Sequence, residues 1–326
     1  MRIQNIARKF ARATMSCAAC MALPLAAQEY PSKPLRLISP FSAGGGADTV
    51  ARFFGQKLAA TLQQQVVVDN RAGAGSIIGT DLAAKSPPDG YTILIVNDTH
   101  AINANLFRKL PYDPIRDFAP ITMIAATPFL LLVHPSLPVK TAQDLVKLAK
   151  SKPGQINYAS SGNGSVAHFA GEFFKINAGV DIVHIPYRGI TQAVIDVTSG
   201  AALMMIVSPL SALPLARAGK LRLLAVTSAK RIALLPDAPT VAESGFAGFD
   251  FGSWNGIMVP AKTPREINAR IYNATISTLK NPTVVKRMSE LGYVIVGNTP
   301  EQFAAVLKSE NDIYGPVIRK AGIKID

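Results

Sequence analysis

Two glycine-rich loops, each lying between an apolar run and a helix-like run, are the segments of this chain best suited to bind a ligand. The first is SPFSAGGGAD, residues 39–48, which follows the apolar run LRLI. Glycine allows a ligand close to the backbone, and a helix N-terminus offers unpaired N–H groups and a positive dipole end. The pattern predicts a carboxylate-binding loop with Asp48 as the helix N-cap. The alternative is a tight turn that binds nothing.

The second loop repeats this design within INYASSGNGSVAHFAGEFF, residues 156–174. Ser165 can cap the following helix, while Ser160 and Ser161 add hydroxyl donors. We expect a carboxylate to be held between the two loops by backbone N–H groups and hydroxyls, without positive side chains at the contact. The candidate ligand-binding residues are Phe41, Ser42, Ala43, Gly44, Gly45 and Asp48 in the first loop, and Ser160, Ser161, Gly162, Asn163, Gly164 and Ser165 in the second.

Three further side chains are candidates for the same ligand. His168 lies in the first helical turn after the second loop, and Tyr187 and Arg188 end the strand-like run DIVHIPY. An arginine can bind a carboxylate in bidentate fashion. The alternatives are a core histidine and an ordinary surface arginine. His184, inside the apolar run, is interpreted as a core residue.

A third glycine loop imitates a dinucleotide-binding fingerprint. Gly73, Gly75 and Gly79 follow the strand-like run QVVVDN with G-x-G-x-x-x-G spacing, and Asp98 ends the next strand. The intervening residues DNRA disturb the tight turn that the fingerprint requires. A loop that lines a cleft, or packs close to it, is therefore favoured over a nicotinamide-binding oxidoreductase.

Enzymatic and metal-binding patterns do not appear in the sequence. The four histidines lack H-E-x-x-H spacing, and SGNGS is not the G-x-S-x-G nucleophile elbow. We expect no cofactor, no metal and no enzymatic activity; an exported hydrolase or dinucleotide-dependent oxidoreductase is the alternative.

The N-terminus resembles a secretory signal. Four basic residues precede ATMSCAACMALPLAA, which predicts cleavage after Ala27 and export to the periplasm. Cys17 and Cys20, the two cysteines, lie in this segment, so the remaining chain has no thiol chemistry. Its removal lowers the formal net charge from +13 to +9. The basic residues are dispersed, which favours attraction of small anions over nucleic-acid binding.

The elements that position these loops follow an α/β pattern. Apolar runs such as LRLI, YTILIV, FLLLV, ALMMIV and NGIMVP read as buried strands of parallel sheets, and amphipathic runs between them read as helices. Thr141, Thr263, Asn281 and Thr299 mark expected helix starts. We predict two lobes joined by two crossing strands, near TPFLLLV and GSWNGIMVP. Lobe 1 would comprise residues 28–128 and 254–326, and lobe 2 residues 129–253, after a signal peptide over residues 1–27.

The mature chain resembles the periplasmic solute receptors of tripartite tricarboxylate transporters, the Bug receptors. The resemblance is carried by YPSKPLRLISPFSAGGGADTVAR, VDNRAGAGSIIGTDLAAKSPPDGYTIL, INYASSGNGSVAHFAGEFF, DIVHIPYRG, AGKLRLLAVTSAKR and PDAPTVAESG, in this order. It implies a two-lobed, type II-like Venus-flytrap protein that binds a small carboxylate through the loops 42–48 and 160–165. It also implies integral membrane subunits as partners. We further expect a monomer that presents its ligand to those subunits or to a sensor.

One departure from the family pattern bears on the ligand. Where G-x-x-D-x-x-x-D is expected, this chain has GAALMMIV, so Leu203 and Val207 occupy the acidic positions. A carboxylate that could hold a ligand ammonium group is absent there. The sequence therefore predicts a dicarboxylate or aromatic carboxylate without an amine.

Overall fold

The computed structural model describes residues 30–323. Residues from Lys33 onward form one compact unit. The expected signal peptide, with both cysteines, lies outside the described residues.

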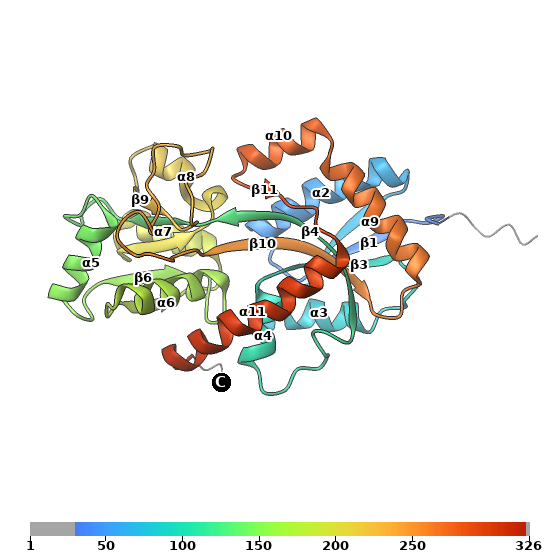
Figure 1. Ribbon diagram of the computed structural model, residues 1–326, viewed down its shortest axis with the longest axis horizontal. Helices are drawn as coiled ribbons and strands as arrows, with labels where there is room; N and C mark the ends of the chain where they lie inside the picture. The colour runs from blue at the N-terminus through green and yellow to red at the C-terminus, as the bar shows by residue number, and fades with distance from the viewer. Residues whose placement is uncertain (1–29, 324–326) are drawn as a thin grey trace, which may run out of the picture. The chain divides into compact units, whose positions relative to one another are not determined.

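The first sheet carries the first and third glycine loops at the ends of its strands (Figure 1). Its strand order is β11-β4-β10-β3-β1-β2. Strands β1, β2 and β3 are parallel, whereas β10 is antiparallel to both β3 and β4. The strands are β1 Leu35–Ser39, β2 Val66–Asn70, β3 Thr92–Asn97, β4 Phe118–Pro128, β10 Gly252–Pro260 and β11 Val294–Ile295.

The helices of this lobe pack on the sheet through apolar faces. The spacing in the helix after β1 predicts one apolar face made of Val50, Phe53, Phe54, Leu58 and Leu62. All of these are buried except Phe53, which is half-buried. The helical elements are α2 Gly46–Leu62, η1 Ala74–Ser76, α3 Ile77–Ala84, α4 Thr99–Leu106, α9 Arg265–Leu279, α10 Pro282–Glu290 and α11 Pro300–Ala321.

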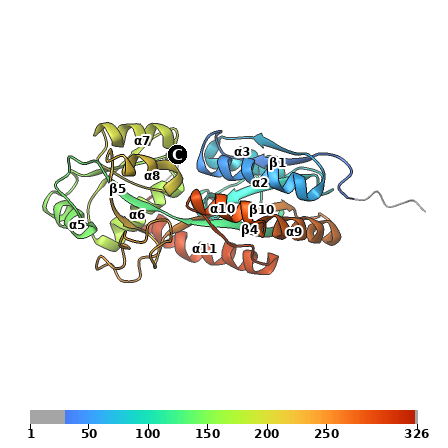
Figure 2. The same cartoon turned by 90° about the horizontal axis from the view of Figure 1, so that it is seen from above.

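The second sheet carries the other glycine loop, and its order is β7-β6-β8-β5-β9. Strand β6 is parallel to β7 and β8, and β5 is antiparallel to β8 and β9. Figure 2 shows this lobe beside the first one. Its elements are β5 Leu130–Val133, α5 Ala142–Ser151, β6 Asn157–Ser160, α6 Val166–Ala178, β7 Val183–Pro186, α7 Ile190–Ser199, β8 Met204–Val207, α8 Pro209–Arg217 and β9 Arg222–Val226.

These two mixed sheets confirm the α/β class but correct the expectation of purely parallel sheets. A chain that leaves one lobe and returns must cross in both directions, so its crossing strands enter each sheet antiparallel to a neighbour. The length of β4 was also not predicted, and the strand includes Pro120, a residue usually confined to edge strands and bulges. The neighbour β11 pairs only with Ala125 and Ala126, so Pro120 lies on an edge where its missing N–H group is not needed.

Thr227 ties the two crossings together where they meet. The Phe129 N–H donates to the Thr227 hydroxyl oxygen at 2.7 Å, and that hydroxyl donates to the Phe251 carbonyl at 2.6 Å. Both crossings are therefore held in one hydrogen-bonded unit.

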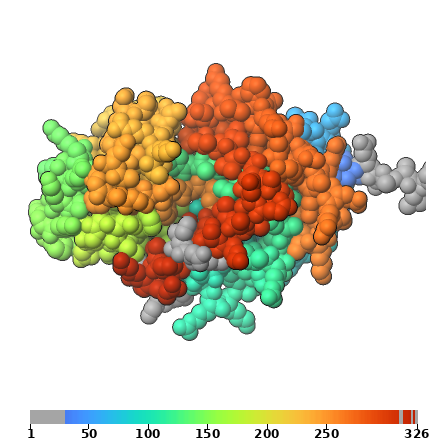
Figure 3. All heavy atoms as spheres, viewed as in Figure 1, coloured from blue at the N-terminus to red at the C-terminus, as the bar shows by residue number. Residues whose placement is uncertain are grey.

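Helix α11 links the lobes a third time, and in Figure 3 it runs across both. The ring of Tyr314 contacts Phe169 of α6 edge-on, with 5.4 Å between centroids. Val317 is buried in the same core cluster as residues of the second sheet. The lobe boundaries expected at 128/129 and 253/254 stay a prediction, and the end of α11 packs with both parts.

Most helix starts are where the sequence places them. Thr141 and Thr299 form capping boxes, and Asn281 caps α10 with Pro282 in its first turn. Two expectations are corrected. The cap of α2 is Gly45, not Asp48, and α9 begins after Pro264 rather than with it. In both helices the start is shifted by one turn or less, within the usual uncertainty of helix ends.

Candidate ligand-binding site

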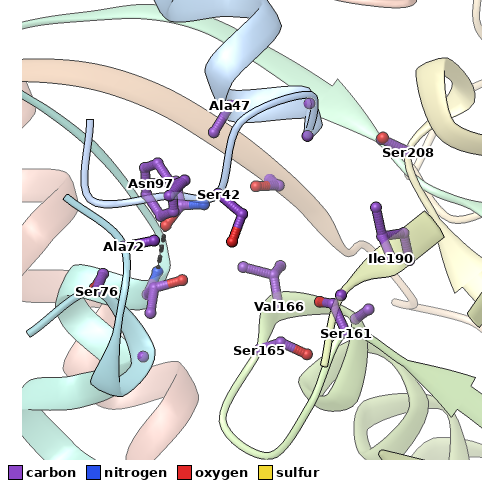
Figure 4. A pocket seen from close by; sticks show the side chains of 18 of the residues that line it. Ser42, Ala47, Ala72, Ser76, Asn97, Ser161, Ser165, Val166, Ile190 and Ser208 are labelled. Atoms are coloured by element: carbon purple, nitrogen blue, oxygen red, sulfur yellow. Dashed lines mark hydrogen bonds between the residues drawn. The ribbon is translucent and has the colours of Figure 1, made fainter. Parts of the chain in front are cut away.

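A cavity of about 460 Å³ is lined by residues from both lobes. Figure 4 shows Ser42, Ser76 and Asn97 on one side and Ser161, Ser165 and Ile190 on the other. Arg188 is the one charged residue among the described residues that line it. Helices α2, α4, α6, α7 and α8 all begin at the wall, so their positive dipole ends face the same space. The cavity is therefore suited to an anion.

The first glycine loop supplies one wall. Of its predicted site residues, Phe41, Ser42 and Gly45 line the cavity, whereas Ala43, Gly44 and Asp48 line a separate groove on the outer side of α2. Gly44 has a φ of +81°, which glycine adopts without strain. This turn brings the first residues of α2, Gly46 and Ala47, to the cavity wall.

Asp48 holds the loop from behind. One carboxylate oxygen accepts hydrogen bonds from the Gly44 N–H at 2.9 Å and Arg52 Nε at 3.0 Å, and the other accepts from Asn70 Nδ2 at 2.7 Å. The same Asn70 nitrogen donates to the Phe41 carbonyl at 3.1 Å. Burial raises the pKa of Asp48, but the hydrogen bonds from Asn70, Gly44 and Arg52 together outweigh it and hold the pKa below its usual value. The ionised Asp48 therefore holds the loop at two points: it binds the Gly44 N–H directly, and it binds Asn70, which in turn holds the Phe41 carbonyl.

We expect Asp48→Asn to destabilise the folded protein by about 1–2 kcal/mol, because it replaces a charged acceptor with an amide that donates toward other donors. Urea unfolding at pH 7 measures this loss. The loss should shrink as the pH falls below about 4, because Asp48 of the unfolded chain takes up a proton there, and it should vanish below the lowered pKa of the folded carboxylate. An equal loss at pH 3 and pH 7 would contradict this role.

The second glycine loop supplies the facing wall. Ser161, Asn163, Gly164 and Ser165 line the cavity. The Ser165 hydroxyl caps α6 by accepting from the His168 N–H at 3.3 Å, as predicted from the sequence. Two hydroxyls and the first N–H groups of α6 are therefore available on this side. Ser160 and Gly162 are not among the lining residues.

His168 lies beneath the loop and is not among the lining residues. Its Nδ1 accepts from the Gly164 N–H at 3.1 Å, and its ring stacks on His184 with centroids 3.9 Å apart. His184 Nε2 contacts the Ser160 hydroxyl at 2.6 Å. Burial lowers the pKa of His168 to about 3, with a smaller contribution from His184, and burial lowers that of His184 to about 4. Two neutral imidazoles therefore support the backbone of the loop.

Arg188 reaches the cavity, whereas Tyr187 does not line it. Tyr187 packs at the edge of the second lobe's core, and burial, with Asp196 beside it, raises its pKa. Arg188 immediately precedes Gly189, the N-cap of α7. A guanidinium and a helix N-terminus therefore lie next to each other on this wall.

The floor of the cavity was missed by sequence reasoning. It comes from the ends of the central strands and from the turn after α10, and its polar residues are Asn97, Thr99, Thr127, Ser253, Asn255 and Tyr293. Asn97 could have been predicted from the sequence, because it stands at the carboxyl end of a buried strand, where open α/β sheets bind ligands. Asn255 had no such signal, since its strand runs the other way.

The third glycine loop also lines the cavity, through residues 72–76. Gly79 lies one turn further, in α3, and a Cβ there would be 2.6 Å from the Arg71 carbonyl oxygen. Val207, at the end of β8, reaches the cavity wall, but Leu203 is not among its lining residues. The family pattern places an acidic residue at position 207, and in this chain the cavity wall is apolar there because the residue is Val207.

Across residues 30–323, no helix has the length and apolarity required to cross a membrane. The same stretch contains no group of three or more histidine, cysteine, aspartate or glutamate side chains placed to hold a metal ion.

Comparison with known proteins identifies the family to which the chain belongs. The family model described as tripartite tricarboxylate transporter family receptor matches residues 50–323. The chain is 34% identical to Protein BugT of Bordetella pertussis over 307 residues, which is 94% of each chain. It is similar to the structure titled R. palustris Rpa4515 with adipate, with a TM-score of 0.85 and 34% identity over 91% of this chain and 99% of that one. It is also similar to MatC from Rhodopseudomonas palustris with bound malate, with a TM-score of 0.81 and 29% identity over 89% of this chain and 100% of that one.

Proposed function

Because the chain belongs to the tripartite tricarboxylate transporter receptor family, we propose that it captures a small dicarboxylate in the cavity between its lobes. The protein is a solute-binding receptor with the two-lobed fold of periplasmic binding proteins. We further propose that it works in the periplasm with integral membrane partners.

One observation carries the proposal: the cavity wall has five helix N-termini and one cation, Arg188, but no acidic residue among the described lining residues. Such an environment stabilises negative charge from several directions. A monoanion would leave part of this positive potential unused, whereas a dianion can use both lobes at once. The adipate and malate in the two similar structures are dicarboxylates.

We assign one carboxylate to each wall. Ser42 and Gly45, with the first N–H groups of α2, would hold the first carboxylate. Ser161 and Ser165, with Arg188, would hold the second. The residues of the two predicted loops that do not line the cavity would act indirectly, since Asp48 and His168 each hold the backbone of a loop.

Closure of the lobes would retain the ligand. The lobes already touch beside the cavity, because a Cβ on Gly292 would lie 2.8 Å from Cβ of Pro209 in the second lobe. The crossings tied by Thr227 offer the place to bend. Hinge closure of this kind converts binding into a shape that a partner can recognise. We propose integral membrane subunits, or a sensor, as that partner of a monomeric, non-enzymatic receptor.

The test is the thermal stability of the mature protein in the presence of mono-, di- and tricarboxylates, aromatic acids and amino acids. A ligand at 100 times its Kd should stabilise the fold by about 2.7 kcal/mol. A selective shift with a dicarboxylate supports the proposal. A shift with a nicotinamide dinucleotide, and none with any acid, would overturn it.

Ligands with an amine should bind more weakly. Val207 is a buried apolar side chain that lines the cavity. A ligand ammonium group beside it would lose its water without gaining an acidic partner. We expect aspartate to bind at least about tenfold more weakly than succinate, a difference on the order of one charge-assisted hydrogen bond. Calorimetric titration compares the two directly. Tight binding of aspartate or glutamate would contradict this expectation.

A further inference from the structure

Two hydroxyl groups from different lobes converge on the start of α2. If Gly46, the first residue of α2, carried a Cβ, that atom would lie 3.3 Å from the Tyr293 hydroxyl oxygen and 3.8 Å from the Ser208 hydroxyl oxygen. Tyr293 follows α10 in the first lobe, and Ser208 precedes α8 in the second. All three residues line the cavity, and in Figure 4 Ser208 lies across it from Ala47 in the first turn of α2.

Tyr293 has a hydroxyl proton to donate. Its side chain is 4% exposed, and its hydroxyl donates to no acceptor within residues 30–323. The turn that carries it is fixed, because the Thr127 hydroxyl donates to the Gly292 carbonyl at 2.7 Å and the Tyr293 N–H donates to the Met288 carbonyl at 2.9 Å. A buried donor without an acceptor is costly, and a ligand in the cavity can supply the acceptor.

Ser208 stands opposite as a second donor. It is the N-cap residue of α8, yet its side chain makes no capping hydrogen bond. Its hydroxyl oxygen lies 3.2 Å from that of Ser211, which also lines the cavity. Only one of the two hydroxyl hydrogens is used between the two serines. The other hydrogen is therefore available to a ligand.

Two helix N-termini meet at the same place. Helix α2 begins after Gly45 and α8 begins after Ser208, and neither start has a side-chain cap. The N–H groups of Gly46 and Ala47 have no acceptor within their own helix, as at any helix start. The positive dipole ends of both helices add to the two hydroxyl donors. A carboxylate matches this environment, because it carries negative charge and its two oxygens accept several hydrogen bonds.

We propose that Tyr293 and Ser208 bind the ligand carboxylate held at the start of α2, so that this one carboxylate is bound by both lobes. The inference rests on the proposed function, which places a carboxylate at this helix start but assigns it to the first lobe alone. Without the anion, two positive helix ends and two hydroxyl donors face one another with no common acceptor, which opposes closure. With the anion, the same groups hold the lobes together.

Calorimetric titration with succinate, malate and adipate tests the proposal, and the probe that wild type binds most tightly is used for the variants. Tyr293→Phe and Ser208→Ala each remove one hydroxyl, and each should weaken binding about tenfold. The matched controls outside the cavity are Tyr272→Phe in α9 and Ser289→Ala in α10, which should bind within twofold of wild type. Thermal melting without ligand verifies that all four variants fold. A folded Tyr293→Phe or Ser208→Ala protein that binds as wild type does would overturn the assignment.

Gly46→Ala tests the position of the carboxylate. Its methyl group would take the space between the two hydroxyls, so affinity should fall at least about tenfold. Adding Tyr293→Phe or Ser208→Ala to Gly46→Ala should then weaken binding by no more than about twofold, because the carboxylate has already been displaced. Gly55→Ala, further along the same helix and outside the cavity, is the control and should bind as wild type does.

Two outcomes of the Gly46→Ala experiment would overturn the inference and leave the dicarboxylate function standing. Unchanged affinity would mean that water, not a carboxylate, occupies this point. Losses that multiply in the double variants would mean that the two hydroxyls contact another part of the ligand. Failure of wild type to bind any of the three probes would instead contradict the proposed function, and the inference with it.

Discussion

Replacing Gly79 with alanine should destabilise the protein by about 2 kcal/mol, even though alanine is the better helix former. The new Cβ would lie 2.6 Å from the Arg71 carbonyl oxygen and 2.8 Å from Cβ of Pro40. These contacts are with backbone and with a proline ring, so neither can turn away. Overpacking of this kind costs about 3 kcal/mol, and the higher helix propensity of alanine over glycine offsets about 1 kcal/mol of that loss. Urea unfolding measures the net loss.

Gly55→Ala is the matched control for Gly79→Ala. Gly55 is also buried inside a helix, but a Cβ there would meet methyl groups of Val66 and Val68 at 3.4 Å, an ordinary packing distance. This variant should be as stable as wild type or more stable. Because Pro40 lines the cavity and Arg71 precedes the lining residue Ala72, Gly79→Ala should also reduce the thermal shift caused by a dicarboxylate. Equal stability of both variants would show that α3 does not approach this closely.

Glu310→Gln should remove a large part of the pH dependence of stability. Glu310 accepts a hydrogen bond from Trp254 Nε1, and its other carboxyl oxygen is buried without a partner among the described residues. Asp98 accepts from Trp254 N at 3.1 Å and from the Tyr314 hydroxyl at 3.0 Å. Burial, and then the charge of Asp98, raise the pKa of Glu310 to about 9; burial also raises that of Asp98. Between pH 5 and pH 8 the folded protein therefore keeps a proton that the unfolded chain releases.

This retained proton determines how the stability of the folded protein changes with pH. Stability is greatest below the unfolded pKa of Glu310 and falls as the pH rises toward 9. Glutamine keeps the acceptor for Trp254 but has no proton to lose. From pH 5 to pH 8, wild type should lose on the order of 3 kcal/mol more than Glu310→Gln does. Urea unfolding at several pH values gives both slopes.

Glu301→Gln is the control on the same helix. Glu301 is exposed, and hydrogen bonding at the start of α11 lowers its pKa, so it stays ionised in both states across this interval. Its pH profile should follow that of wild type. Parallel profiles for wild type and Glu310→Gln would mean that Glu310 is charged in the folded protein, contrary to its burial beside Asp98.

Much of the fold could be predicted from the sequence because the signals are local. Thr141 with Asp144, and Thr299 with Gln302, specify helix starts within four residues, and the structure has both capping boxes. Short runs such as LRLI and ALMMIV are strands of the sheets. The direction of the crossing strands was not predictable in this way, since it depends on which lobe the chain enters next.

The sequence by itself determined that two glycine loops would each follow a buried strand and open a helix, because strand, turn and cap are neighbours in the chain. Only the tertiary structure decided which residues of those loops reach the cavity. Asp48 and His168, which the sequence offers as ligand contacts, do not line the cavity and instead accept hydrogen bonds from the Gly44 and Gly164 N–H groups. Asn255 gave no signal, because its place beside Asn97 depends on an antiparallel pairing between residues far apart in the sequence. Contacts of that kind depend on the packing of the whole chain, which no local pattern records.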